Sequence, residues 1–280
     1  MARKRANERG AETGELLRSA ARALKSGDAE AAESLARRAL ARSPSEQGAL
    51  YLHGLALLSL GQAAAAVEPL EGAAKGNPDP AVETNLATAL EQSGKEKEAL
   101  AWLERAASRS PPFAPAFFRL GRLLHQLNRL VEAKGALRRA LELVPGDAEA
   151  ALALAEVLTE LGEARAARDA YTRALAARPG WPQARRGIAR TLMDEGDYKA
   201  AVAVLSRLVE DNPADSNSLL DLGFSLQELG RLEDALATYA KAAAVDPGAY
   251  KQALHSLISA ARGTFWLRPS AAAKKLPRPS

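Results

Sequence analysis

Apolar residues recur along this chain at the spacing of amphipathic helices, in a unit of about 34 residues. In the fifth unit, Leu154 and Leu158 lie on one predicted helix, and Ala167, Tyr171 and Ala174 share a face of the next. The same order of apolar and polar positions returns in seven units. The pattern predicts an all-α chain built of helix pairs.

Each unit carries two residues that end helices. A proline, which lacks a backbone donor and clashes with the preceding turn, is expected to end the second helix. These prolines are Pro44, Pro78, Pro111, Pro145, Pro179, Pro213 and Pro247. Seventeen residues before each proline lies a residue suited to left-handed backbone, which is expected to end the first helix. These residues are Gly27, Gly61, Gly94, Asn128, Gly162, Gly196 and Gly230.

Small residues at two further positions predict closely packed helices. Twelve residues before each proline lie Ala32, Ala66, Ala99, Ala133, Ala167, Ala201 and Ala235. Five residues before it lie Ala39, Ala73, Ala106, Ala140, Ala174, Leu208 and Ala242. Leucine or tyrosine between the two alanines is expected to fill the space between the helices.

This combination resembles the tetratricopeptide repeat. The fourth unit carries it as Leu120, Gly121, Leu124, Asn128, Ala133, Leu137, Ala140 and Pro145. The seventh carries it as Leu222, Gly223, Leu226, Gly230, Ala235, Tyr239, Ala242 and Pro247. Ser19 and His53 replace the usual leucine in the first two units, and Leu208 replaces a small residue. The resemblance implies a right-handed α-solenoid of about seven helix-turn-helix repeats.

The predicted organisation has four parts. Residues 1–12 form a frayed basic lead-in, and residues 248–263 form a capping helix, because a solenoid must cover its last apolar face. Residues 264–280 hold three prolines without periodicity and are expected to form an extended basic tail. Between them lie seven repeats at 13–46, 47–79, 80–113, 114–147, 148–181, 182–215 and 216–247.

The charge distribution argues against a nucleic-acid-binding array. The whole chain of 280 residues carries 38 Lys+Arg and 34 Asp+Glu, a net charge of +4. Residues 1–12 carry +2, residues 13–246 carry −4 and residues 247–280 carry +6. A nucleic-acid-binding solenoid would place its positive charge along the repeats, so no nucleic acid is expected there.

The chain offers little material for catalysis or for a metal. It has no cysteine and three histidines, of which His53 and His125 lie in different repeats and His255 lies on the predicted capping helix. No Ser–His–acid set, phosphate-binding glycine loop or metal-ligand cluster can be assembled. No cofactor, metal or enzymatic activity is therefore expected.

The sequence also suggests a compartment. No apolar run approaches the roughly eighteen residues of a membrane span. The N-terminal residues are charged and lack the apolar stretch of a secretory signal. We predict a cytoplasmic protein, and the high Ala, Arg and Gly content suggests a bacterial source.

The resemblance implies a concave groove, lined by the first helix of each repeat, that binds a peptide or helix of another protein. Its expected lining residues are Tyr51, Leu55, Asn85, Thr88, Phe118, Arg119, Arg122, His125, Gln126, Glu156, Glu160, Arg186, Arg190, Asp194, Phe224 and Glu228. Arg119 and Arg122, like Arg186 and Arg190, are spaced to project from one helical face and to bind carboxylates. The alternative is a solvated polar face with internal salt bridges.

A carboxylate clamp, as in chaperone-binding members of the family, is not supported. The clamp positions here hold Tyr51, Leu55, Asn85, Pro115 and Arg119, and two of these five match. The sequence therefore gives no reason to name a chaperone as the partner.

The C-terminal tail carries one unusual cluster. It consists of Phe265, Trp266, Leu267, Arg268, Lys274 and Lys275. The aromatics could fold back on the capping helix, or the cluster could act as a linear motif or a membrane-interface anchor. We therefore predict a protein-binding adaptor, with a membrane- or polyanion-associated assembly factor as the alternative. A regulatory subunit of an enzyme is a third possibility that the sequence does not separate from the adaptor.

Overall fold

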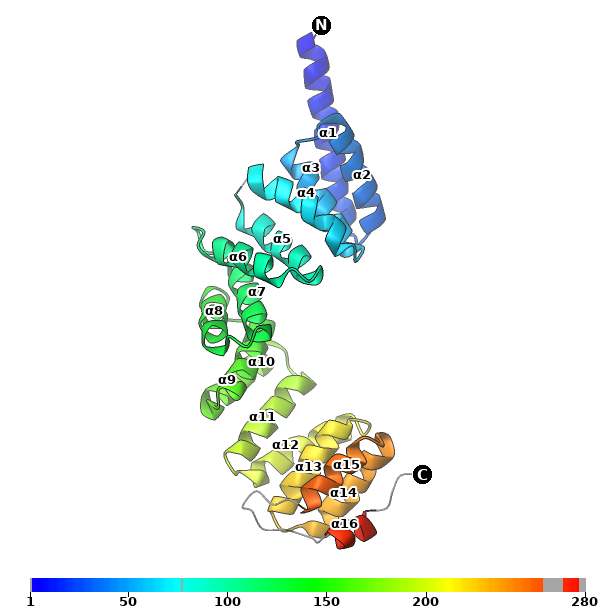
Figure 1. Cartoon of the computed structure of the whole chain (residues 1–280), viewed down its shortest axis with the longest axis vertical. Helices are drawn as coiled ribbons and strands as arrows, with labels where there is room; N and C mark the ends of the chain where they lie inside the picture. Colours follow the sequence, from blue (N-terminus) through cyan, green and yellow to red (C-terminus); the bar gives the residue numbers. More distant parts are fainter. Residues whose placement is uncertain (1, 77, 259–268, 277–280) are drawn as a thin grey trace. The chain divides into compact units, whose positions relative to one another are not determined.

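The described part of the chain is entirely helical. The computed structural model describes residues 2–76, 78–258 and 269–276, and for residues 2–9, 269, 272 and 273 it describes the backbone alone. These residues form sixteen α-helices and no strand (Figure 1), which confirms the predicted all-α class.

The helices fall into two compact units, Met1–Pro145 and Gly146–Ser280. The first unit contains α1 (Ala2–Lys25), α2 (Ala29–Arg42), α3 (Gln47–Ser59), α4 (Ala63–Gly76), α5 (Pro80–Gln92), α6 (Glu96–Ala107), α7 (Ala114–Gln126) and α8 (Leu130–Leu143). The second contains α9 (Ala148–Glu160), α10 (Ala164–Ala177), α11 (Pro182–Asp194), α12 (Tyr198–Asp211), α13 (Ser216–Glu228), α14 (Leu232–Val245), α15 (Ala249–Ile258) and α16 (Pro269–Lys275).

Local sequence sets where these helices end. The six glycines that lie seventeen residues before a proline have φ between 72° and 81°, and Asn128 has φ of 59°. The predicted left-handed conformation is thus confirmed at all seven positions. Helices α8 and α12 end at Leu143 and Asp211, two residues before Pro145 and Pro213. Each turn is short, so consecutive helices pack against one another.

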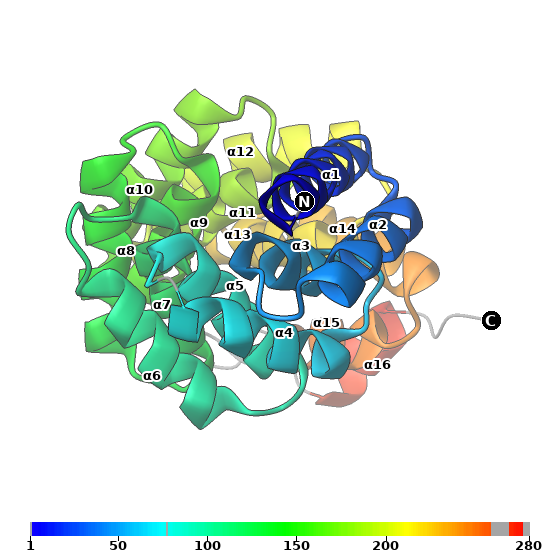
Figure 2. The ribbon, with the colours of Figure 1, turned by 90° about the horizontal axis from the view of Figure 1, so that it is seen from above.

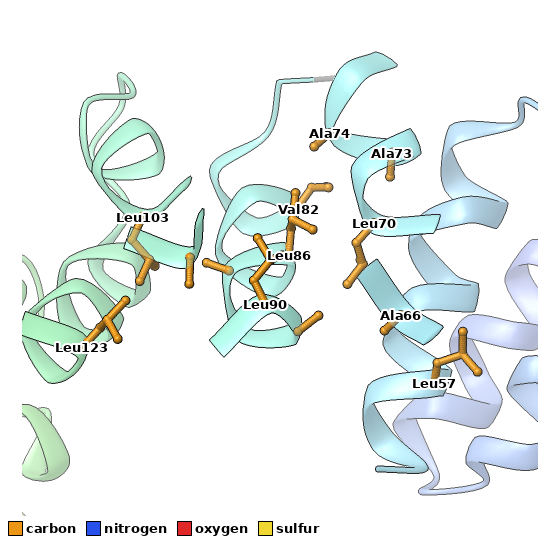
Figure 3. Packing of buried hydrophobic residues seen from close by; sticks show 13 residues of the cluster. Leu57, Ala66, Leu70, Ala73, Ala74, Val82, Leu86, Leu90, Leu103 and Leu123 are labelled. Atoms are coloured by element: carbon orange, nitrogen blue, oxygen red, sulfur yellow. The ribbon is translucent and has the colours of Figure 1, made fainter. Parts of the chain in front are cut away.

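Alanine allows this close packing. The alanines twelve residues before each proline are all fully buried, and Leu208, at the other small-residue position, is 3% exposed. In the first unit, leucines including Leu70, Leu86 and Leu103 complete a continuous core between the alanines. Figure 3 shows this cluster extending across successive helices from Leu57 to Leu123.

The odd-numbered helices form the inner layer of each unit. In the first unit α1, α3, α5 and α7 contact one another in sequence, and in the second α9, α11, α13 and α15 do so. Among the described residues, consecutive even-numbered helices make no comparable contact. A two-layer stack curves toward its closer-packed layer, so the odd-numbered helices line the concave side. In the first unit, Figure 2 shows α4 and α6 outside α3 and α5.

The two ends of the chain are more helical than expected. Helix α1 begins at Ala2, where the sequence predicted a frayed lead-in, because Ala, Arg, Lys and Glu are good helix formers. The tail was predicted to be extended, yet Pro269–Lys275 form α16, which packs on α15. Pro269 suits a first helical position and a run of alanines follows it. Leu276, the next residue, is fully buried.

Candidate functional site

The candidate site is the face of the inner helices in each unit, described separately below. In the first unit the predicted residues lie on α3, α5 and α7. In the second unit they lie on α9, α11 and α13. All of the predicted groove residues are therefore on inner helices.

In the first unit, two predicted binding residues are bound to each other. Asn85 Nδ2 donates to the Tyr51 hydroxyl at 2.9 Å and to the Ala81 carbonyl at 3.0 Å. Both side chains are half-buried, and burial raises the pKa of Tyr51. Both side chains are thus engaged within the protein. A ligand could accept a hydrogen bond from Asn85 Nδ2 only by replacing one of these two bonds.

Thr88 corrects the predicted lining. Its side chain is buried, and its hydroxyl donates to the Thr84 carbonyl at 3.0 Å. Its position in the repeat register placed it on the groove surface, but the side chain is buried and its hydroxyl is satisfied by the preceding helical turn. Thr88 is therefore part of the helix packing.

Among the predicted groove residues of the first unit, the exposed ones lie on α7. Arg122 and Gln126 are exposed, and Phe118 and Arg119 are half-buried. Within the described residues, neither arginine makes a hydrogen bond or an ion pair. His125, also on α7, is half-buried and does have an interaction partner.

In the second unit, the arginines of α11 lie close to acidic groups. Arg186 Nη1 is 3.8 Å from Asp215 Oδ1, and Arg190 is exposed. Asp221, on α13, is half-buried, and its burial raises the pKa of its carboxyl group against the attraction of Arg190 and Arg186. This face thus combines two arginines, of which Arg186 has a long ion pair with Asp215, with the partly buried carboxylate of Asp221.

The other predicted residues of this unit lie on either side of the arginines. Glu156 is exposed on α9, and its charge together with those of Arg190 and Arg186 acts on Tyr171. Phe224 is half-buried on α13, and its ring meets that of Tyr198 edge-on, with centroids 6.1 Å apart. Glu160, Asp194 and Glu228 end their helices.

Sequence reasoning missed Asp221 and Tyr198. Asp221 precedes Phe224 by three residues, so helical spacing could have placed both on one face. Tyr198 begins an outer helix, and only the packing of α12 on α13 brings its ring to Phe224.

A further cleft lies on a different surface. It has a volume of about 630 Å³ and lies between α10, α11 and α12. Its lining residues are Leu175, Arg185, Ile188, Ala203, Val204, Arg207, Glu210 and Asp211. None of these residues was predicted to bind a partner.

The histidines form no common site. His53 Nδ1 is 3.9 Å from Glu33 Oε1, and burial lowers the pKa of His53. His255 is exposed on α15. Across the described residues, no group of three histidine or acidic side chains could hold a metal ion.

The predicted tail cluster is described only in part. Lys274 and Lys275 are exposed at the end of α16. Phe265, Trp266, Leu267 and Arg268 lie outside the described residues, as does Gly263. A membrane role for this segment stays a prediction, and no helix among the described residues has the length and apolarity to cross a bilayer.

Comparisons with known proteins point to one family along most of the chain. Two sequence profiles described as tetratricopeptide repeat match residues 17–81 and 51–115, and residues 130–191 and 192–258. No curated protein matches this chain.

Solved structures share the fold. The pilF protein of Pseudomonas aeruginosa is 20% identical, with a TM-score of 0.66 over 80% of this chain and 99% of its own. YrrB, described as a TPR protein with an unusual peptide-binding site, is 23% identical, with a TM-score of 0.62 over 68% of this chain and 98% of its own. A tetratricopeptide repeat protein from Parabacteroides merdae is 18% identical, with a TM-score of 0.59 over 88% and 98%.

Proposed function

This chain belongs to the tetratricopeptide repeat family, and from that premise we propose that it is a non-enzymatic scaffold whose inner helices hold a peptide or helix of a partner protein. Proteins of this family generally bind other proteins or peptides, and one solved structure of the same fold, YrrB, has a peptide-binding site. The proposal includes the cytoplasmic, bacterial setting suggested by the sequence.

One observation carries the proposal. Arg119, Arg122 and Arg190 lie on inner helices without a hydrogen bond or ion pair to any described residue. Guanidinium groups bind carboxylates in bidentate geometry, so these side chains are suited to a partner's acidic groups. The half-buried rings of Phe118 and Phe224 add apolar contact area on the same helices.

The test is capture of partners by the full chain and by charge-reversed variants. Two double variants each reverse the charge of two inner-helix arginines in one unit. They are Arg119→Glu with Arg122→Glu in the first unit and Arg186→Glu with Arg190→Glu in the second. We expect at least one of them to lose a protein that the wild type retains, as identified by mass spectrometry. Arg207→Glu, on the outer helix α12, is the matched control and should retain every partner.

Retention of all partners by both double variants would contradict the proposal. Sedimentation with anionic vesicles tests the alternative assembly factor targeted by the tail. Vesicle binding that needs Lys274 and Lys275, together with undiminished binding by the groove variants, would favour that alternative.

A further inference from the structure

We propose that the outer face of α8 is a self-association surface, on which a second copy of this chain packs its own α8 in the antiparallel direction. Helix α8 belongs to the outer layer of the first unit, so this surface is separate from the inner helices proposed to hold a partner. It combines a stripe of charged residues, a glycine within the helix and an apolar cleft.

The charged stripe of α8 is complementary to itself. Glu132, Gly135, Arg139 and Glu142 are exposed and recur every three or four residues, so they share one face of the helix. Arg129, at the start of the helix, continues the series. A two-fold axis just after Gly135 places Glu132 opposite Arg139 of the second copy and brings Arg129 toward its Glu142. A parallel copy in register would instead place like charges opposite one another.

Within one copy these charges form two exposed ion pairs. Arg129 Nη2 is 2.7 Å from Glu132 Oε2, and Arg139 Nη1 is 2.7 Å from Glu142 Oε2. The hydrogen bond from Arg129 lowers the pKa of Glu132, which therefore stays ionised. Exposed pairs of this kind are weak because water screens them. In the antiparallel arrangement the pairs join end to end, so Glu132 faces a guanidinium on each side.

Gly135 has no packing role within its own copy. A Cβ added there meets no atom within 4 Å, whereas at Gly72, inside the outer helix α4, it would lie 3.1 Å from Leu50. Glycine inside a helix is destabilising relative to alanine, so its presence on α8 needs another reason. The equivalent positions of the other repeats hold Ser34, Glu68, Ala101, Asp169, Ala203 and Ala237. We infer that Gly135 lets a second helix approach closely at the centre of the stripe.

An apolar cleft of about 350 Å³ opens beside the stripe. Phe117 and Leu120 of α7 line it, together with Glu104 of α6 and Glu132. Glu104 is exposed and makes no hydrogen bond or ion pair within the described part of the chain. Arg139 of the second copy, placed opposite Glu132, covers apolar surface with its methylene groups and brings its guanidinium to these carboxylates. The second copy thus supplies a residue that completes the cleft.

The contact is small, which sets the strength of the association. A single pair of helices buries less area than a standard protein interface, so the dimer is weak and forms at high protein concentration. Val131, which is 70% exposed and borders the stripe, loses part of its contact with water there. The inner helices of both copies stay uncovered, so the dimer presents two partner sites at once.

Sedimentation velocity of the full chain measures this association. We expect the wild type to be monomeric near about 1 µM and partly dimeric near about 500 µM. Glu132→Arg and Arg139→Glu each place like charges opposite one another, so each should weaken the association at least about tenfold. Arg173→Glu, at the position equivalent to Arg139 one repeat further on, is exposed and is the matched control. It should associate like the wild type.

A mixture of the two charge variants tests the antiparallel pairing. The Glu132→Arg copy has arginine at both positions and the Arg139→Glu copy has glutamate at both. Their mixture should therefore associate about as tightly as the wild type, although neither variant does so alone. Gly135→Leu should also prevent association, because its side chain blocks the approach of the second helix. Circular dichroism checks that each variant keeps its helix content.

Several results would overturn the inference. They are a wild type that stays monomeric up to about 500 µM, an association that both charge variants retain, and a mixture that stays monomeric. Loss of a different captured protein by Gly135→Leu, with a monomeric wild type, would assign the surface to another partner and would also overturn it. None of these results bears on the proposed function, which is tested by the inner-helix arginine variants.

Discussion

At the scale of single residues, one close contact joins a glycine to an aromatic ring. A Cβ added at Gly223 would lie 2.6 Å from Tyr239 Cε1, closer than real carbon atoms pack. Tyr239 is fully buried, which raises its pKa, and its hydroxyl lies 3.3 Å from Gln227 Oε1. Gln227 Nε2 in turn donates to the Ser256 carbonyl at 2.8 Å. Gly223 thus leaves room for the Tyr239 ring, whose hydroxyl begins a chain of hydrogen bonds from α14 through Gln227 of α13 to Ser256 of α15.

Gly223→Ala tests this contact. The added methyl group should overpack the site and lower the free energy of unfolding by about 1–3 kcal/mol, measured by urea denaturation. Gly135→Ala is the matched control, because a Cβ there meets no atom within 4 Å. The control should be neutral or stabilising by up to about 1 kcal/mol, owing to the helix propensity of alanine. Equal effects of the two substitutions would show that the ring does not limit the space.

His53 makes stability depend on pH. Burial lowers the pKa of His53 below its usual 6.5, despite the attraction of Glu33. The unfolded chain therefore binds the proton more readily, so stability falls as the pH drops below about 6.5 and is kept above it. His53→Gln should flatten this part of the stability curve between pH 5 and 8, whereas His255→Gln, at an exposed histidine, should not. An unchanged slope in His53→Gln would contradict the assignment.

At the scale of helices, a buried carboxylate joins α5 to α6 and the turn that follows it. The Glu83 side chain is fully buried. Its Oε1 is 2.9 Å from Arg105 Nε and 2.7 Å from Arg109 Nη2. Arg105 also lies over the Trp102 ring, 4.8 Å from the ring centre. The cluster holds the end of one helix pair together.

Glu83→Gln keeps the shape of the side chain and removes its charge. We expect a loss of about 1–3 kcal/mol in unfolding free energy, since the arginines are partly exposed and regain water. Glu98→Gln is the control, because its ion pair with Lys95 is exposed and 3.9 Å long. The control should change stability by less than about 0.5 kcal/mol. A comparable loss in both variants, measured by thermal denaturation, would argue against a special role for Glu83.

Leu276, which directly follows α16, anchors this helix on α15. Leu276 is fully buried in the cluster that includes Ala253 and Leu257 of α15. The Tyr250 hydroxyl donates to the Leu276 carbonyl at 3.4 Å. The contact covers an apolar part of α15 that solvent would otherwise reach.

Leu276→Ala should release this segment. Removing the buried side chain weakens its docking, so trypsin should cleave beside Lys274 and Lys275 at least about tenfold faster. Leu229→Ala, at a leucine that is 41% exposed, is the control and should leave that cleavage rate unchanged. Equal cleavage of wild type and Leu276→Ala would mean that α16 does not depend on the contact.

At the scale of the whole molecule, the net charge of +4 conceals an acidic array with basic ends. We expect the full chain to bind a duplex DNA oligonucleotide only at low salt and to lose it near 150 mM, because few phosphates are neutralised. Replacing Lys274, Lys275 and Arg278 with Gln should weaken that binding, and Arg190→Gln should not. Fluorescence anisotropy measures both. Binding that persists at high salt and needs Arg190 would contradict this expectation.

The sequence alone determined the repeats, the helix ends and the family. Proline, glycine and alanine act on the backbone and on neighbouring turns, so their spacing predicts structure without knowledge of distant contacts. Asn128 illustrates this, because its place in the register predicted the left-handed φ of 59° that the structure has. The profile matches confirm the family to which the pattern pointed.

Only the tertiary structure decided which side chains of the inner face are engaged. Three features depend on more than one helix. Tyr51 is hydrogen-bonded to Asn85 of the next inner helix, Asp221 is partly buried by its neighbours, and Leu276 packs against α15. Helical spacing predicts the face on which a residue lies, but hydrogen bonding and desolvation depend on what the neighbouring helix places opposite. The sequence therefore predicted which helices form the inner face, and the packing of one helix on the next decided which of its side chains are buried or hydrogen-bonded.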